Sequence, residues 1–161
     1  MLASVTSLRQ KFCISCGEMQ GIRSLDALCW WGPVNQLFGY ALVFFGGGCG
    51  ASLRHAINMA SARALGTDFP WGTFIINITG STVMGLIAGY LAFKGGATQH
   101  WRLFLMTGIL GGYTTFSAFS LDTALLYERG ALGLAALYVL GSVGISIAGL
   151  FGGLALMRYF S

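Results

Sequence analysis

Two apolar stretches of this sequence carry neutral hydrogen-bonding side chains at helical spacing. Each set recurs at i, i+4 and i+8, and the two sets are Thr73, Asn77 and Ser81, and Tyr138, Ser142 and Ser146. Residues at this spacing share one face of an α-helix. Amide and hydroxyl groups can replace the water around an ion, and hydroxyls serve an ion of either sign. The spacing therefore predicts two polar tracks that are suited to ion binding.

Each track also has a plainer interpretation. A buried amide costs free energy without a partner, so Asn77 could simply hydrogen-bond one helix to another. Serines in membrane helices often bond back to their own backbone. We favour the ion path for both tracks, because Asn77 belongs to a stripe and three hydroxyls in register argue for a shared polar surface.

A third stretch, GGYTTFSAFS at residues 111–120, interrupts an apolar run that is long enough to cross a membrane. Gly111, Gly112, Thr114 and Thr115 lower the helix propensity in the middle of this run. A broken membrane helix is tolerated only where it is buried in protein or lines a polar cavity. We therefore predict a break whose freed carbonyls can hold a cation.

Two phenylalanines follow the predicted break. Phe116 and Phe119 are three residues apart, with Ser117 between them, so a resumed helix presents both rings on one side. Ring edges carry partial positive charge and offer a weakly polarised surface to an anion. The alternative is lipid contact, but their place directly after the break favours a pore-lining role.

Membrane-spanning helices must position these groups. Of the 161 residues, 55% are hydrophobic and 9% are charged, and the mean hydropathy is +0.72, which is too apolar for an ordinary soluble domain. A hydrocarbon core of about 30 Å takes roughly 20 apolar residues to cross. Four stretches suffice, at residues 37–57, 71–93, 101–126 and 132–160. The predicted fold is an all-α membrane protein with four transmembrane helices, the third broken in mid-membrane.

Small residues should bring these helices close together. Gly46 and Gly50 have the G-x-x-x-G spacing of close membrane contacts, and Gly85 and Gly89 repeat it in the second span. Cys49 lies among the first-span glycines, and we expect it to be a small packing residue.

Charged residues are nearly confined to the ends of the predicted spans. No Lys, Arg, Asp or Glu lies in the middle of a span. Arg54, near the far end of the first span, either snorkels to the interface, or directs its charge into a vestibule or pairs within the fold. No nucleophile with a base and no metal cluster can be assembled, so we do not predict an enzyme.

Residues 1–35 differ from the rest of the chain, because they carry charges and no sustained apolar run. We expect a disordered extension or an over-long start, with the true start near Val34 or Leu37, ahead of a membrane domain at residues 36–161. The segment lacks the apolar core of a signal peptide. Cys13 and Cys16 form a lone C-x-x-C without the second pair of a structural zinc site, so a metal is not predicted there.

Three segments carry a resemblance to a known family. GGGCGASLRH, GTFIINITGS and GGYTTFSAFS resemble, in this order, the motifs of the fluoride channels of the CrcB or Fluc type. The resemblance covers the chain from about Leu37 to its end. It implies an antiparallel homodimer with two fluoride pores and a structural sodium ion at the dimer interface. It also implies passive export of fluoride across the bacterial inner membrane, which relieves toxicity in the cytoplasm.

Carried over by position, the resemblance gives a role to each candidate residue. Gly111 and Thr114 would hold the sodium ion through their backbone carbonyls, and Arg54 matches a first-span arginine. The pore residues, with Asn77 as a fluoride ligand and the two rings edge-on, would be Asn77, Phe116, Phe119, Ser117, Tyr138, Ser142, Ser146 and Thr73.

The match has two minor departures within the third-span signature. Ala118 stands where the signature often has threonine, so any hydroxyl role there is lost or moved. Tyr113 occupies a variable aromatic position.

The alternative from another class is a small four-helix multidrug exporter, which can also form an antiparallel dimer. Such a transporter usually needs an acidic residue within a span to couple protons to its substrate. Asp122 lies too close to the end of the third span to serve in this way.

Charge counting predicts how the chain inserts, because Lys and Arg in short flanking segments bias orientation. From residue 37 onward the two sides carry three charges each, Lys94, Arg102 and Arg158 against Arg54, Arg63 and Arg129. A balanced core should insert both ways, as an antiparallel homodimer requires. Arg9, Lys11 and Arg23 of the extension would make the count six against three, so the functional product should start near Val34 or tolerate the extension.

Overall fold

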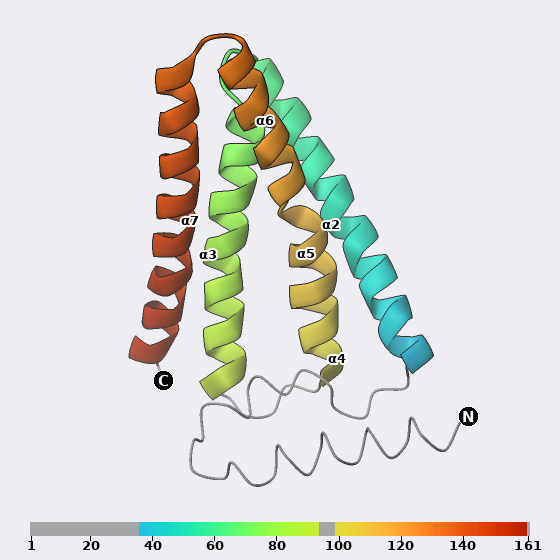
Figure 1. Cartoon of the computed structure of the whole chain (residues 1–161). Helices are drawn as coiled ribbons and strands as arrows, with labels where there is room; N and C mark the ends of the chain where they lie inside the picture. Colours follow the sequence, from blue (N-terminus) through green and yellow to red (C-terminus); the bar gives the residue numbers. More distant parts are fainter. Residues whose placement is uncertain (1–35, 94–98, 161) are drawn as a thin grey trace, which may run out of the picture. The chain divides into compact units, whose positions relative to one another are not determined.

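The computed structural model describes residues 36–93 and 99–160, and these residues form a bundle of helices (Figure 1). In chain order the elements are α2 (Gln36–Leu65), α3 (Trp71–Phe93), α4 (Gln99–Arg102), the π-helix η2 (Leu103–Leu110), α5 (Gly111–Tyr113), α6 (Phe116–Glu128) and α7 (Leu132–Tyr159). Four helical segments in this part of the chain are long and apolar enough to cross a membrane, the third running over Gln99–Glu128. The predicted four spans are thus confirmed, whereas residues 1–35 and Lys94 lie outside the described residues.

The first span is longer than predicted. Helix α2 has 30 residues, about 45 Å at 1.5 Å per residue, against a hydrocarbon core of about 30 Å. It continues through residues 58–65, where polar side chains can be solvated outside the hydrocarbon. It ends before Gly66, whose φ of 81° is the left-handed conformation that commonly terminates a helix.

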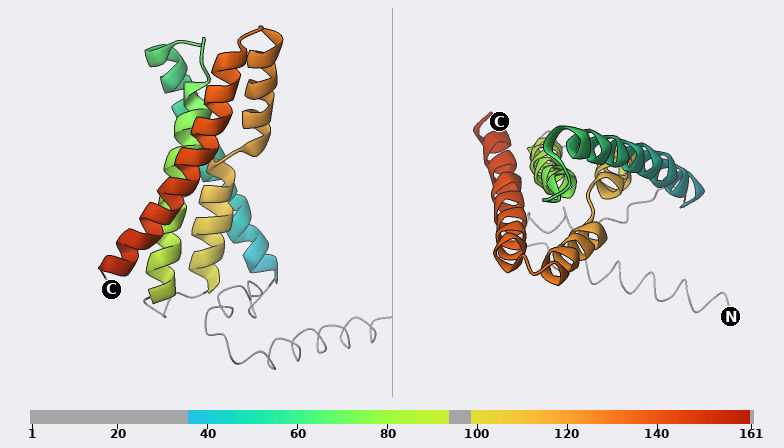
Figure 2. Two further views of the ribbon diagram at one scale, coloured as in Figure 1. Left: turned by 60° about the vertical axis from the view of Figure 1, so that its left-hand side comes forward. Right: turned by 90° about the horizontal axis from the view of Figure 1, so that it is seen from above.

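Helix α3 lies at the centre of the bundle. It packs along α7 and also contacts α2. The third span changes neighbours along its length, because η2 and α5 lie against α2 while α6 lies against α7 (Figure 2). The break in this span is therefore what brings α6 and α7 together.

Glycines set the closest helix contacts. A Cβ on Gly46 would lie 2.8 Å from the Phe104 carbonyl oxygen, and one on Gly50 would collide with the Ile109 carbonyl. In the other pairing, a Cβ on Gly89 would lie 2.6 Å from Met157 Cβ. These contacts confirm the predicted glycine faces. The prediction for Cys49 was wrong within this subunit, since its side chain is exposed.

The break lies later in the GGYTTFSAFS motif than its glycines suggested. Gly111 and Gly112 are still helical, and the extended residues are Thr114, with φ −76° and ψ 155°, and Thr115, with φ −151° and ψ 121°. Gly112 instead permits a close helix contact, because a Cβ there would lie 2.5 Å from the Gly47 carbonyl oxygen. The two β-branched threonines thus form the break itself.

The π-helix η2 was not predicted. Its wide turn ends where the Gly111 N–H reaches the Met106 carbonyl, five residues back. This turn lies against the glycine face of α2, where a Cβ on Gly108 would be 3.0 Å from Gly46 Cα. Apolar periodicity cannot distinguish such a local widening from an ordinary helix.

The end of α6 turns the chain back beside itself. Gly130, with φ 74°, donates to the Tyr127 carbonyl at 2.9 Å, and Ala131 donates to the Leu126 carbonyl at 3.0 Å. This pair of bonds is the Schellman motif. It lets α7 return antiparallel to α6 and places Tyr138 beside the residues that follow the break.

Candidate ion-conduction site

Asn77 holds the break from helix α3. Its Nδ2 donates to the Thr115 carbonyl at 3.1 Å, and the Thr115 N–H donates to Asn77 Oδ1 at 3.0 Å. The side-chain amide thus pairs with both backbone groups of one extended residue, as a neighbouring strand would. Asn77 therefore does join two helical spans by hydrogen bonds. Its role as a fluoride ligand stays a prediction.

Thr115 also starts the helix that follows it. Its hydroxyl oxygen accepts the Ala118 N–H at 3.2 Å as the N-cap of α6. Ser117 is exposed, and its Oγ lies 3.2 Å from the same Thr115 oxygen. Within the break, the Thr114 hydroxyl donates to the Leu110 carbonyl at 2.9 Å.

These bonds divert the amides that would otherwise cover two carbonyls. In a continuous helix the Gly111 carbonyl accepts from the N–H of Thr115, and the Thr114 carbonyl accepts from the N–H of Ala118. Here the first amide donates to Asn77 and the second to the Thr115 hydroxyl. Both carbonyls that are predicted to hold a cation thus lose their helical donors, so the residues fit such an ion.

The two phenylalanines lie side by side but in different surroundings. The ring centroids of Phe116 and Phe119 are 5.5 Å apart, with the planes tilted by 40°. Phe119 is 8% exposed and packs in a cluster with Leu126, Ala135 and Tyr138, whereas Phe116 is 78% exposed. The prediction that both rings share one side of the helix is confirmed, and their pore-lining role stays a prediction.

Tyr138 begins the polar track on α7 and is fully buried. Its hydroxyl donates to Asp122 Oδ2 at 3.2 Å. Sequence reasoning considered Asp122 only as a proton-coupling group and missed this contact. Its position three residues after Phe119, on the face that packs against α7, was the available signal.

The hydroxyl groups of the next two residues of the track are buried without partners in the described part of the chain. The Oγ atoms of Ser142 and Ser146 are inaccessible and find no hydrogen-bond partner among the residues that the structure describes. The back-bonding interpretation is therefore wrong for these two serines. Other hydroxyls in the bundle do bond back, as Thr82 does to the Ile78 carbonyl at 2.9 Å.

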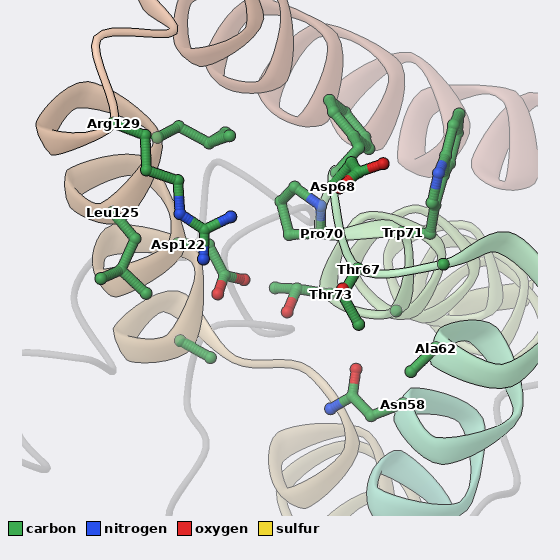
Figure 3. Close-up of a pocket in the computed structure, with 15 residues that line it drawn as sticks. Asn58, Ala62, Thr67, Asp68, Pro70, Trp71, Thr73, Asp122, Leu125 and Arg129 are labelled. Carbon is green, nitrogen blue, oxygen red and sulfur yellow. The ribbon is translucent and has the colours of Figure 1, made fainter.

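An open cavity of about 340 Å³ lies beside the Tyr138 end of the track (Figure 3). Asp122 projects into it from α6, Arg129 from the C-cap position after α6, and Thr73 faces it from the start of α3. Asp122, which accepts the hydrogen bond of Tyr138, thus lines the cavity. Arg54 is not among the lining residues and is partly exposed on α2.

Comparison with known proteins matches residues 41–154 to the family described as CrcB-like protein, Camphor Resistance (CrcB). A protein of Rhodopseudomonas palustris strain BisB5, named fluoride-specific ion channel FluC, is 76% identical over 119 residues, which are 74% of this chain and 96% of the relative. The fluoride-specific ion channel FluC 2 of Nitrobacter hamburgensis is 71% identical over 122 residues, 76% of this chain and 98% of the relative. A protein of Methylobacterium nodulans, also named fluoride-specific ion channel FluC, is 60% identical over 119 residues, 74% and 95% of the two chains.

Proposed function

Because the chain belongs to the CrcB family, we propose that it forms a fluoride channel through which fluoride leaves the cytoplasm passively. The observation that carries the proposal is the pair of buried hydroxyls, Ser142 and Ser146, that have no acceptor among the described residues. A buried donor without a partner costs about 1–3 kcal/mol, and a bound anion would remove that cost. The names of the relatives supply the identity of the anion.

In this proposal, fluoride passes from the cavity to the hydroxyl groups of the track. The cavity beside Thr73, Asp122 and Tyr138 admits water from one end of the bundle, and the two serine hydroxyls continue along α7. Fluoride is small and strongly hydrated, so it needs hydrogen-bond donors in place of the water it loses. Neutral donors bind an anion weakly enough to release it, as conduction requires.

Asn77 serves both the fold and the ion in this proposal. Its amide has two N–H donors, and one of them donates to the Thr115 carbonyl. The second is the group that would bind fluoride, together with Ser117 and the edges of Phe116 and Phe119. Arg54 would draw anions toward a vestibule through its charge.

A second, antiparallel copy of the chain would complete the channel. Phe116 is 78% exposed in the single subunit although it follows the break directly, which fits a surface that another subunit covers. The Gly111 and Thr114 carbonyls of one subunit offer two oxygens, so two copies would offer a sodium ion four. Rings of backbone carbonyls are established ligands of monovalent cations.

The balanced charges of the core support this assembly. With three Lys or Arg on each side from residue 37 onward, neither orientation is favoured. We propose that the product inserts both ways into the bacterial inner membrane. A single reactive cysteine at the C-terminus, in protein without the native cysteines, tests this through labelling from both sides. Labelling from one side only would contradict dual topology.

Ion efflux from proteoliposomes tests the function itself. Vesicles that contain the purified full chain are loaded with fluoride or with chloride, and protein-free vesicles measure the leak. We expect rapid fluoride efflux and chloride efflux no faster than the leak. Equal efflux of the two anions, or no fluoride efflux, would contradict the proposal. Uptake of an organic cation that depends on a pH gradient would instead support the exporter.

A further inference from the structure

Helix α3 contacts the break at a second point besides Asn77. Tyr113, the last residue of α5, is 7% exposed, and its hydroxyl oxygen lies 2.8 Å from Thr79 Oγ1. Thr79 is two residues after Asn77, and Tyr113 is two residues before Thr115. The pair therefore joins the same helix to the opposite flank of Thr114.

The direction of these hydrogen bonds follows from counting protons. The single proton of the Thr79 hydroxyl is donated to the Ile75 carbonyl at 2.7 Å. Thr79 can then only accept from Tyr113. The result is a chain of two bonds, from the Tyr113 hydroxyl to Thr79 and from Thr79 to the backbone of α3, which fixes the buried ring to a rigid element.

Gly80 makes this double contact possible. A Cβ at this position would collide with Thr114 Cγ2 and lie 3.1 Å from Tyr113 Cδ1. The absence of a side chain lets α3 approach the break closely enough for hydroxyl and amide groups to reach it. Thr114 thus packs on Gly80, with a hydrogen-bonded residue on each side.

We propose that Tyr113 and Thr79 form a hydroxyl clamp that positions the Gly111 and Thr114 carbonyls for cation binding. The inference rests on the function proposed above. Asn77 fixes the break only from Thr115 onward. Without the hydroxyl clamp, no side-chain hydrogen bond within the described ranges joins α5 to α3, and the peptide groups on either side of Thr114 can rotate. Both residues act through the carbonyls and are positioning residues.

The test measures fluoride efflux of the full chain in proteoliposomes as sodium is titrated. Tyr113→Phe and Thr79→Val each remove one hydroxyl from the clamp, from opposite ends of the same bond. Loss of one such bond should raise the half-saturating sodium concentration roughly two- to tenfold. Efflux at saturating sodium should return toward the wild-type rate. A purely structural role would lower the melting temperature without this shift.

Thr82→Val is the matched control. Thr82 lies on the same helix and makes the same backbone bond, to the Ile78 carbonyl, but it faces α7 at Gly149 and not the break. Its sodium dependence should equal that of the wild type. Thr79→Ser keeps a hydroxyl and should restore most of the affinity, and the double variant should be no weaker than either single variant because both lack the same bond.

Two results would overturn the inference in distinguishable ways. If wild-type efflux depends on sodium but Tyr113→Phe and Thr79→Val show the same dependence, the clamp is wrong and the sodium site stands. If wild-type efflux is independent of sodium, the proposed cation site is wrong and the hydroxyl clamp has no carbonyl site to position. The proposal that the protein conducts fluoride would still stand.

Discussion

The break in the third span and the track on α7 are both polar features among apolar helices, but the structure treats them in opposite ways. At the break, α3 pairs with the extended backbone through Asn77, and the Thr115 hydroxyl takes up the Ala118 amide. Along α7, the hydroxyls of Ser142 and Ser146 are buried and find no partner in the described ranges. The polar groups of the break have partners within the protein, and the two hydroxyls of the track have none in the described ranges.

This difference separates architecture from conduction. A lipid-embedded backbone break must have its groups satisfied internally, so its partners belong to the fold. A buried hydroxyl without a partner costs free energy in the empty protein, and in the proposed channel a bound anion would remove that cost. Substitutions at the break should therefore lower stability and flux together, whereas substitutions along the track should lower flux alone.

The largest effect is expected for Asn77→Asp. The carboxylate can still accept the Thr115 N–H, but its second oxygen replaces the donor 3.1 Å from the Thr115 carbonyl and places two acceptors in contact. Negative charge beside an anion path adds to this cost. We expect fluoride efflux to fall more than about tenfold and the melting temperature to drop, because a buried acceptor that loses its donor costs about 1–3 kcal/mol.

Efflux and melting must be measured on the same Asn77→Asp preparation. Wild-type efflux from a well-folded variant would show that Asn77 does not line the pore and that its hydrogen bonds to Thr115 are not needed for the break. A lower melting temperature with normal efflux would leave Asn77 a structural role only. Substitutions at the break would then not lower stability and flux together.

The next effect sharpens the architectural side alone. In Gly50→Ala the new methyl group would collide with the Ile109 carbonyl, whereas in Gly48→Ala it meets nothing within 4 Å. Overpacking of this kind costs about 1–3 kcal/mol. Thermal melting in detergent should show the loss for Gly50→Ala and no change for Gly48→Ala. Equal melting temperatures would mean that α2 can move away from η2 without cost.

The sequence predicted what depends on spacing along one helix. The four spans, the glycine faces and the shared side of Phe116 and Phe119 follow from periodicity and composition. The position of the break within its motif could not be predicted, because Gly112, which lowers helix propensity, is used for close contact with α2 and stays helical. The bonds of Asn77 to Thr115 and of Tyr138 to Asp122 join residues on different helices, so they depend on packing that no local pattern encodes.

A smaller effect tests the conductive side. Ser142→Ala removes a buried hydroxyl that has no partner in the described part of the subunit, so the melting temperature should stay the same or rise slightly. Fluoride efflux should fall roughly three- to tenfold, since one donor to the anion is worth about 1 kcal/mol. Ser146→Ala should behave in the same way. A lower melting temperature with unchanged efflux would show that the hydroxyl serves the fold.

The smallest effect on flux is expected at the two rings, which lie where the break and the track meet. Phe116→Ile and Phe119→Ile each remove one ring edge, and an aromatic contact is worth about 0.5–1.5 kcal/mol, so efflux should fall about threefold in both.

The stability of the two variants should differ. Phe119 packs against Tyr138 with centroids 5.2 Å apart, and its loss should lower the melting temperature. Phe116 is 78% exposed, and its loss should leave the melting temperature of a monomer unchanged. If Phe116→Ile lowers the melting temperature only at protein concentrations that favour dimers, the ring is covered by a second copy. If it changes neither efflux nor melting at any concentration, the Phe116 ring faces lipid, and Phe119 is the only one of the two rings that lines the fluoride path.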